Sequence, residues 1–274
     1  MKSKKSDKEP MPSEDQHTFP VTVLRRDSPV PEEGRRALIQ ESPLIISLNW
    51  AQEYSIMRTP GHDEELTVGF LFTEAIIQGV DEITLMRKCK GEKGGMDVST
   101  LDTGTPPVKR ATAINSSCGL CGRVDLDSLI EGLKPVTEAF LFPAELLHGL
   151  PQHVREAQAL FHATGASHAV ALFDALGQVV VVREDVGRHS ALDKVIGERL
   201  LARKPLASHG AFLSGRASLE MIIKAARAGF PMVASVSAPT DMAVKAAERL
   251  NITLCGFVRG REITIYSHPE RIKV

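Results

Sequence analysis

The sequence predicts an α/β protein in which a smaller α+β unit precedes a larger unit built on a sheet. From residue 169 onward, apolar runs of strand length alternate with helices, a pattern typical of a mostly parallel sheet covered on both faces. Before residue 107, strand-like runs outnumber helices. A length of 274 residues, 43% of them hydrophobic, suits one large or two small globular domains.

The N-terminal third is predicted to hold a tail and the smaller unit. Residues 1–19 are rich in Lys, Glu and Pro, so we expect a disordered tail. Residues 20–107 form the α+β unit, with strands expected at 21–26, 44–50, 53–58, 83–90 and 96–101. A helix is expected after the turn Thr59-Pro60-Gly61, with Asp63 as its N-cap and Ile77 near its end. This helix is apolar almost all round, which predicts burial on most sides.

Residues 108–274 are predicted to form the larger unit. Its strands are expected at 108–114, 169–173, 179–183, 211–214, 232–236, 252–257 and 262–266. Helices are expected near 126–133, 151–163, 192–200 and 219–226, and after Thr240 as far as Leu250. In the helix at 219–226, Leu219 and Ile222 should face the core, and Glu220 and Lys224 should form an outward i,i+4 pair.

Charge and hydropathy exclude several classes of function. The 33 basic and 34 acidic residues balance, so no global field favours nucleic acid or an anionic membrane. No apolar run approaches the roughly 20 residues that span a bilayer, and the N-terminus lacks the apolar core of a secretory signal. We therefore expect a cytoplasmic protein that neither inserts into membranes nor binds nucleic acid.

The paired cysteines Cys118-Gly-Leu-Cys121 are the clearest chemical motif. They follow a predicted strand and precede a predicted helix, so they lie on a strand-to-helix turn or in the first helical turn. A helix N-terminus stabilises a thiolate, which favours Cys118 as a nucleophile and Cys121 as its partner. Half of a zinc site and an inert buried pair remain alternatives. The lone Cys89 and Cys255 sit in apolar strand-like segments, where core packing is expected.

A zinc deaminase is a sharper metal alternative. Such enzymes carry H-x-E upstream of P-C-x-x-C, and His62-Asp63-Glu64 is an H-x-E upstream of the cysteine pair. Ser117 stands where that pattern has proline. Acidic residues at the start of a helix also have a capping explanation.

Three further segments could bind a polar ligand, because each joins a strand to a helix. The first, Glu184-Asp185-Val-Gly-Arg188-His189, offers carboxylates and cations, although a helix cap with exposed ion pairs would give the same pattern. The second, Leu213 to Ser218, brings backbone N–H groups and Arg216 to a helix N-terminus that could receive a phosphate. The third, Ser235 to Thr240, is similar and rich in hydroxyls. Together the last two indicate a nucleotide-like ligand, though each is also an ordinary N-cap.

Taken in order, these motifs resemble the FdhD family of formate dehydrogenase accessory sulfurtransferases. The resemblance covers roughly Val21 to the C-terminus. It also includes Met57-Arg-Thr-Pro60, Glu64-Glu-Leu66 with Gly69-Phe-Leu71, and Asp193-Lys-Val-Ile-Gly197. Ser190 and Ala75 depart from the family's usual Asn and Gly, but no sulfur-handling residue is lost.

The resemblance implies a fold and a function. The implied fold is a three-layer α/β/α sandwich similar to cytidine deaminase, with a smaller extra domain, in a homodimer. The implied function is that of a sulfurtransferase, which takes persulfide sulfur from a cysteine desulfurase. It passes that sulfur to the molybdenum cofactor in its bis(molybdopterin guanine dinucleotide) form, before the cofactor enters apo formate dehydrogenase. The cofactor is thus a bound substrate, and no metal of the protein's own is expected.

The resemblance also assigns roles to residues. Cys118 would carry the persulfide, after its thiolate takes the outer sulfur of the donor, and Cys121 would assist or resolve it. The nucleotide end of the cofactor would be held by two turns and one cleft-lining segment, comprising Ser214, Gly215, Arg216, Ser237, Ala238, Pro239, Thr240, Glu184, Asp185, Arg188 and His189. The alternatives are a zinc-dependent deaminase-like hydrolase and a non-catalytic chaperone that binds the cofactor without moving sulfur.

Overall fold

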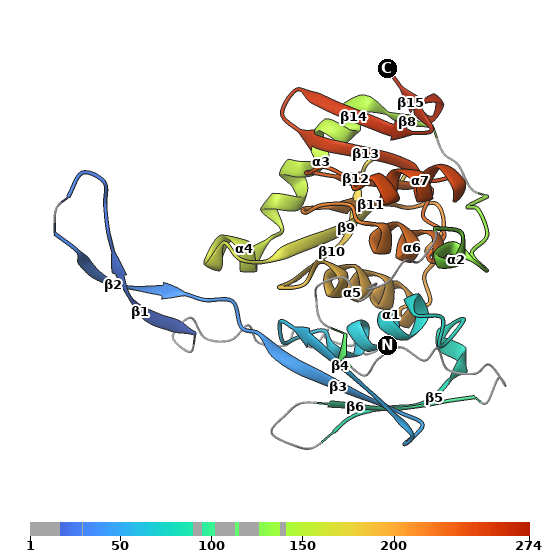
Figure 1. Cartoon of the computed structure of the whole chain (residues 1–274), viewed down its shortest axis with the longest axis horizontal. Coiled ribbons are helices and arrows are strands. Elements are labelled where there is room, and N and C mark those ends of the chain that lie inside the picture. The colour runs from blue at the N-terminus through green and yellow to red at the C-terminus, as the bar shows by residue number, and fades with distance from the viewer. Residues whose placement is uncertain (1–16, 29, 90–94, 102–112, 115–125, 138–140) are drawn as a thin grey trace, which may run out of the picture.

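The structure is a computed structural model, and it describes residues 17–28, 30–89, 95–101, 113–114, 126–137 and 141–274. Two sheets of different size dominate it, a five-stranded one near the N-terminus and a six-stranded one in the C-terminal part (Figure 1). The expected tail, residues 1–19, lies almost wholly outside the described residues. The predicted α/β class is confirmed, with helices and strands mixed throughout.

The smaller unit is a mixed sheet with one helix against it. Its strand order is β5 (Ile83–Lys88), β6 (Gly95–Thr100), β3 (Ser42–Leu48), β4 (Gln52–Arg58) and β7 (Ala113–Ile114). Alternate residues of β3 and β4 are buried, and they pack with helix α1 (Asp63–Thr73) in one apolar cluster. The short 3-10 helix η1 (Val80–Glu82) leads into β5. Residues 113–114, expected to end the first strand of the larger unit, pair with β4 of this sheet.

The larger sheet is mixed, so the prediction of a mostly parallel sheet is wrong. Its order is β10 (Val179–Asp185), β9 (His168–Phe173), β11 (Gly210–Leu213), β12 (Met232–Ser235), β13 (Thr253–Arg259) and β14 (Glu262–Ser267). Only β11–β12 and β12–β13 are parallel pairs. The β9–β10 and β13–β14 hairpins add antiparallel strands at both edges, because their short turns cannot make a crossover.

Helices cover both faces of the larger sheet. Helix α3 (Ala144–Glu156) packs on one face in a cluster with Phe142, Phe173 and Phe212. On the other face, α5 (Arg188–Leu201), α6 (Leu219–Arg227) and α7 (Asp241–Arg249) bury a second cluster, against which α2 (Leu126–Ile130) also packs. The closer likeness to cytidine deaminase stays a prediction. Short strands β8 (Phe142–Pro143) and β15 (Ile272–Lys273) pair with each other, and η2 (Pro269–Arg271) precedes β15.

Two helix boundaries differ from the prediction. The helix expected at 151–163 is two helices, because α3 starts at Ala144 and a second helix, α4 (Ala159–Thr164), follows a break. Pro151 lies within α3, and the carboxylate of Glu184 accepts hydrogen bonds from the N–H groups of Leu160 and Phe161 at the start of α4. Helix α1 ends at Thr73, short of Ile77, and its N-cap is His62 in a left-handed conformation, not Asp63.

The two units meet where α1 crosses α5. A Cβ on Gly69 would lie 1.8 Å from the carbonyl oxygen of Asp193, and one on Gly197 would lie 1.8 Å from that of Glu65. The helix backbones therefore touch, and only glycine fits at these two positions. Beside the crossing, Arg183 and Glu65 form a two-pronged ion pair between the units, with N–O distances of 2.5 and 2.7 Å.

A buried ion pair lies at the same crossing. The ammonium group of Lys224 lies 2.9 Å from both carboxylate oxygens of Asp193 and 2.7 Å from the hydroxyl of Thr73. Lys224 is only 7% exposed. The prediction of an outward Glu220–Lys224 pair is therefore wrong, because a carboxylate on α5 and a hydroxyl on α1 draw the lysine inward.

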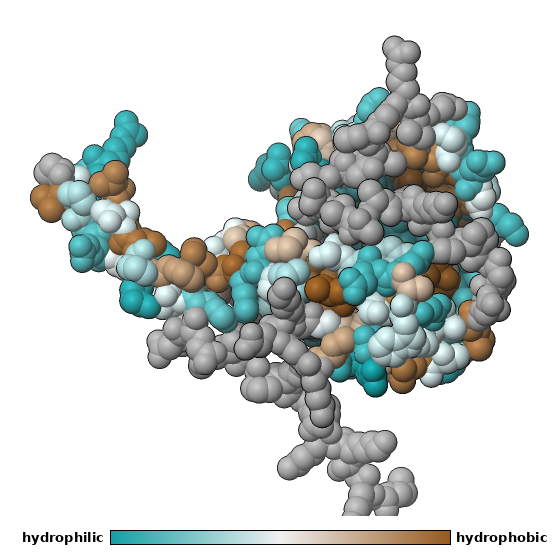
Figure 2. Space-filling view, turned by 60° about the horizontal axis from the view of Figure 1, so that its bottom comes forward, coloured by the Kyte–Doolittle hydropathy of each residue, from teal (hydrophilic) through white to brown (hydrophobic). Residues whose placement is uncertain are grey.

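A hairpin of β1 (Thr18–Val23) and β2 (Glu32–Ala37) projects from the body of the molecule (Figure 1). Strand β1 starts and ends about three residues earlier than predicted, and β2 was not predicted. Figure 2 shows apolar and polar side chains alternating along this projection. Phe19 is 50% exposed and Leu24 78% exposed, so the hairpin buries little apolar surface within its own chain.

We expect Gly69→Ala to destabilise the protein strongly, because the new methyl group would overlap the Asp193 carbonyl and force α1 and α5 apart. Overpacking of this kind costs about 1–3 kcal/mol or more in the free energy of unfolding. Urea denaturation of the full chain measures it.

Gly149→Ala in α3 is the matched control. Its new Cβ would make an ordinary contact 3.6 Å from the His153 ring. Helix propensity then predicts an unchanged or slightly increased stability. Equal urea midpoints for the two variants would contradict the backbone contact between α1 and α5 at Gly69.

Candidate functional site

The candidate site lies at one edge of the larger sheet, where three strands end. Strands β10, β11 and β12 point the same way, since β9 runs antiparallel to both of its neighbours. Their ends carry the three segments that the sequence singled out, namely Glu184–His189, Leu213–Ser218 and Ser235–Thr240. The structure therefore brings these segments to a common edge, as expected for ligand sites in open α/β sheets.

The second and third segments are bonded to each other. The Ser235 hydroxyl donates to the carbonyl of Gly215 at 2.6 Å, and the Thr240 N–H donates to the carbonyl of Ala217 at 3.0 Å. An isolated bridge joins Ala217 and Pro239. The two turns thus form one bonded rim, in which Ser237 and Ala238 are half-buried.

Some predicted ligand hydroxyls have structural partners instead. The Ser214 hydroxyl accepts from the N–H of Ala169 at 2.8 Å, and the Thr240 hydroxyl accepts from the N–H of Ala243 as an N-cap. Gly215 has another use, because its lack of a side chain leaves room for His168. A Cβ at Gly215 would lie 3.0 Å from the Nδ1 atom of that ring.

A cluster of cationic side chains surrounds His168, the first residue of β9. Burial lowers the pKa of His168, and the nearby Arg188, His189 and Arg216 lower it further, while Asp185 acts in the opposite direction. Arg216 is exposed and Arg188 and His189 are half-buried. The ring nitrogen Nε2 of His189 lies 2.9 Å from a carboxylate oxygen of Glu220. The guanidinium groups of Arg188 and Arg216, next to the two imidazole rings, therefore make a partly accessible edge suited to an anion.

The two acidic residues predicted for the cleft, Glu184 and Asp185, bind groups of the protein itself. Glu184 binds the start of α4 as described, and it also accepts a 2.6 Å bond from the hydroxyl of Ser167. Asp185 is fully buried, and one of its oxygens lies 2.8 Å from the ammonium group of Lys194. Burial raises the pKa of Asp185 against the opposing effect of Lys194. Neither carboxylate is available to a ligand, so both act by shaping the edge.

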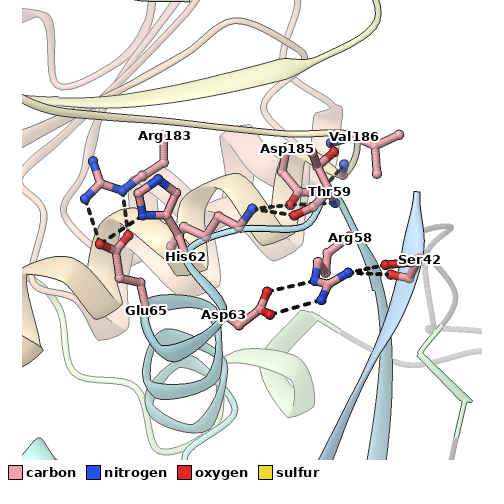
Figure 3. Close-up of polar contacts among 11 residues, drawn as sticks. Ser42, Arg58, Thr59, His62, Asp63, Glu65, Arg183, Asp185 and Val186 are labelled. Atoms are coloured by element: carbon pink, nitrogen blue, oxygen red, sulfur yellow. Dashed lines mark hydrogen bonds and ion pairs between the residues drawn. The ribbon is translucent and has the colours of Figure 1, made fainter. Parts of the chain in front are cut away.

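Asp185 also joins the two units. Its carboxylate accepts from the N–H groups of Gly187 at 2.8 Å and Thr59 at 3.1 Å. Figure 3 shows Asp185, Thr59 and Val186 together, beside the Arg58–Asp63 ion pair of the smaller unit. Thr59 follows β4, so the end of β4 meets the end of β10 here.

A cavity of about 600 Å³ adjoins the cationic cluster, on the side of the sheet that α3 covers. Cavities of this size accommodate small organic ligands. The guanidinium group of Arg155 lies 4.0 Å from the centre of the Phe161 ring on this wall. The lining combines apolar and amide side chains with His168 and Ser214, and comprises Pro151, Gln152, Arg155, Gln158, Phe161, Gly165, Ala166, Ser167, His168, Phe212, Ser214 and Val236.

Cys118 and Cys121, the predicted sulfur-handling residues, lie outside the described residues. The other two cysteines differ from each other. Cys255 is fully buried, and burial raises its pKa to about 12, in agreement with a packing role. Cys89 is exposed and lies 3.0 Å from a carboxylate oxygen of Asp97, so the expectation of core packing is wrong for it.

The zinc alternative rests partly on residues that the structure describes. His62 is largely exposed, and its Nδ1 atom lies 3.2 Å from an oxygen of Glu65. Within the described part of the chain, no group of three or more His, Cys, Asp or Glu side chains is placed to hold a metal ion. In that same part, none of the helices has the length and apolarity needed to cross a membrane.

Sequence reasoning missed His168 as a site residue. It is the first residue of a strand that was expected to begin one position later, and a single histidine at a strand end carries no motif of its own. His168 is far from Arg188 and Arg216 in the sequence, so the sequence alone does not show that the three residues lie together. Only the order of the strands in the sheet brings them together.

Comparison with known proteins gives consistent matches. The model of the FdhD/NarQ family matches residues 39–273. A protein of Anaeromyxobacter dehalogenans named sulfur carrier protein FdhD is 40% identical over 269 residues, which cover 92% of each chain. Proteins with that name from Bordetella bronchiseptica and Sulfolobus acidocaldarius are 40% and 41% identical, over 85% of this chain in both cases and 86% and 89% of theirs.

A solved structure is also similar. A chain from Desulfotalea psychrophila, named as a formate dehydrogenase accessory protein, superposes with a TM-score of 0.74 at 25% sequence identity. The match covers 93% of this chain and 98% of that one.

We expect an added anion to raise the pKa of His168, because its negative charge offsets the surrounding cations. Without the anion, His168 should titrate below its ordinary value of about 6.5. The folded chain then binds fewer protons than the unfolded chain, so acidification through this range costs stability. Proton NMR of the imidazole with and without inorganic diphosphate measures the shift, and His168→Gln assigns the signal. Sodium chloride at equal ionic strength is the control. A pKa that responds only to ionic strength would contradict an anion site at this edge.

Proposed function

This chain belongs to the FdhD/NarQ family, and we propose that it carries sulfur to the molybdenum cofactor of formate dehydrogenase. Relatives of about 40% identity are named sulfur carrier proteins, and the similar solved structure is named a formate dehydrogenase accessory protein. These names support the coarse role. The donor, the acceptor and the residues that act are our proposal.

The first step in this proposal is a transfer between thiols. The thiolate of Cys118 attacks the outer sulfur of a persulfide on a cysteine desulfurase. The sulfur–sulfur bond of the donor breaks, and its cysteine leaves as a thiolate. The outer sulfur is now on Cys118 as a persulfide, so the step has no net oxidation or reduction. This step makes the protein a sulfurtransferase.

The second step delivers the sulfur to bis(molybdopterin guanine dinucleotide), which is bound as substrate. The thiolate of Cys121 attacks the inner sulfur of the Cys118 persulfide. A Cys118–Cys121 disulfide forms, and the outer sulfur leaves as hydrosulfide for the cofactor. A cellular dithiol reductant then reopens the disulfide. The loaded cofactor then passes to apo formate dehydrogenase, and in this proposal both steps take place in the cytoplasm.

The observation that carries the proposal is the cationic edge beside the cavity. Arg188, His189 and Arg216 converge around His168, and all four can face the phosphates of a dinucleotide. The adjoining cavity of about 600 Å³ offers Phe161 and the amides of the exposed Gln152 and the buried Gln158 to a purine base. The site needs no metal of its own, since its ligand groups suit phosphate and base.

The placement of β7 supports a link between this site and the cysteines. β7 is the last described element before Cys118, and it lies beside β4 with Ile114 opposite Ile56. The end of β4 in turn meets the end of β10 through Thr59 and Asp185. Residues 113–114, which precede Cys118 in the sequence, thus pair with the strand whose end contacts the ligand turn.

A non-catalytic chaperone is the second candidate, favoured by one observation. The edge offers an anion the side chains of Arg188 and Arg216 beside His168, which could bind a nucleotide without transferring sulfur. A chaperone would bind GDP, a probe for the nucleotide end of the cofactor, with or without Cys118. Sulfur transfer therefore separates the two candidates.

We expect the full chain to accept radiolabelled sulfur from a cysteine desulfurase supplied with labelled cysteine. Cys118→Ala should abolish the thiol-reversible label, because the attacking thiolate is gone. Cys89→Ala is the matched control, since Cys89 is an exposed cysteine outside the proposed route. Protein-bound label measured after gel filtration reports the result. Full labelling of Cys118→Ala would overturn the carrier role and leave the chaperone.

We further propose that the implied homodimer forms through the β1–β2 hairpin. The register places Phe19, Val21 and Val23 on one face of the ribbon, opposite Arg36, Gly34 and Glu32 respectively. An isolated two-stranded ribbon is marginal in water, so this apolar row needs a cover. Two copies facing each other about a two-fold axis would set the Arg36 end of each against the Glu32 end of the other.

We expect Arg36→Glu to weaken the dimer at least tenfold, because it sets like charges opposite each other. The double variant Glu32→Arg with Arg36→Glu should restore it by reversing both charges. Glu33→Arg, on the opposite face of the ribbon, is the control. Sedimentation equilibrium gives the dissociation constants. A monomeric wild type, or a double variant as weak as Arg36→Glu, would rule out this surface.

A further inference from the structure

The N–H, the carbonyl and the hydroxyl of Thr59 all form hydrogen bonds with residues at or near the junction between β10 and α5. Its N–H donates to Asp185 at 3.1 Å, and its carbonyl accepts from the ammonium group of Lys194 at 2.9 Å. Its hydroxyl accepts from the backbone N–H of Val186 at 3.0 Å. Thr59 is 4% exposed and belongs to the smaller unit, directly after β4 (Figure 3). One residue of the smaller unit thus binds the larger unit at three points.

These bonds fix the turn that leads to the cationic edge. The turn has two backbone N–H groups before α5, and Thr59 holds that of Val186 while Asp185 holds that of Gly187. Arg188 and His189 follow immediately as the first residues of α5. A shift of the turn therefore moves Arg188 and His189 relative to His168 on β9 and to Arg216 in the turn after β11.

The hydroxyl of Thr59 is the one of these groups that depends on the side chain. Any residue could supply the backbone N–H and carbonyl, but only threonine or serine places a hydroxyl acceptor at this position. Valine has the same shape and would leave the N–H of Val186 without that acceptor. Serine would keep the acceptor and lose only a methyl group.

We propose that Thr59 is a positioning residue, which sets the ligand-binding turn of the larger unit from the smaller unit. The affinity of the cationic edge for phosphate then depends on a side chain that touches no ligand. That the ligand is a nucleotide rests on the proposed function. The position of the turn rests on the hydrogen bonds of Thr59.

Thr73 provides a matched control. Its hydroxyl is also buried between the units, where it donates to Asp193 at 2.8 Å and accepts from Lys224. Thr73→Val should therefore loosen the same interface about as much as Thr59→Val. Thr73 does not contact the turn at Val186–His189, so its loss leaves the cations in place.

The test titrates GDP into the full chain by isothermal calorimetry, for wild type, Thr59→Val, Thr59→Ser and Thr73→Val. We expect Thr59→Val to weaken binding at least tenfold. Thr59→Ser and Thr73→Val should stay within about threefold of wild type. Thermal melting of each variant confirms that it is folded at the temperature of the titration. Wild-type affinity in Thr59→Val, or equal losses in Thr59→Val and Thr73→Val, would overturn the proposal.

A second measurement, the pKa of His168, reports on the position of the turn without a nucleotide. If Thr59→Val releases Arg188 and His189, the pKa of His168 should rise toward its ordinary value, and Thr73→Val should leave it unchanged. Proton NMR titration of the imidazole measures this. If wild type binds no GDP, the proposed function fails, and this titration alone decides the role of Thr59. An unchanged pKa of His168 in Thr59→Val would then overturn it.

Discussion

The backbone contact between α1 and α5 is the constraint on which the rest of the molecule depends. Gly69 and Gly197 let the two helices touch, and no larger residue fits at either position. Beside this contact, the buried ion pairs Asp193–Lys224 and Asp185–Lys194 of the larger unit form hydrogen bonds with Thr73 and Thr59 of the smaller unit. A buried polar group left without its partner costs about 1–3 kcal/mol, so these bonds favour one placement of the units over others.

That placement decides what the sheet edge can do. Asp185 and Glu184 look like ligand residues in the sequence, yet their oxygens serve Lys194, Thr59 and the start of α4. With these two carboxylates withdrawn, the guanidinium groups of Arg188 and Arg216 remain beside His168, while Glu220 pairs with His189. The edge therefore suits an anion because internal hydrogen bonds use the carboxylates of Glu184 and Asp185. The smaller unit contributes to the ligand site through Thr59 without reaching the ligand.

The sequence predicts the elements better than their arrangement. Strands β3, β4, β9, β11, β12 and β13 and helices α5, α6 and α7 lie close to where periodicity places them. The split of the helix at 151–163 could not be foreseen, because the acceptor at the break is Glu184, which is distant in sequence. Lys224 was placed outward for the same reason, since its partners are on other helices. Arg188, His189 and Arg216 were identified from strand-to-helix junctions, whereas His168 needed the strand order.

A crystal structure of the full chain with GDP tests the central claim most directly, because it locates the nucleotide end of the cofactor. The account predicts that the phosphates contact Arg188, Arg216 and His168, and that the base enters the cavity beside Phe161. GDP bound elsewhere on the molecule, with this edge empty, would contradict the account.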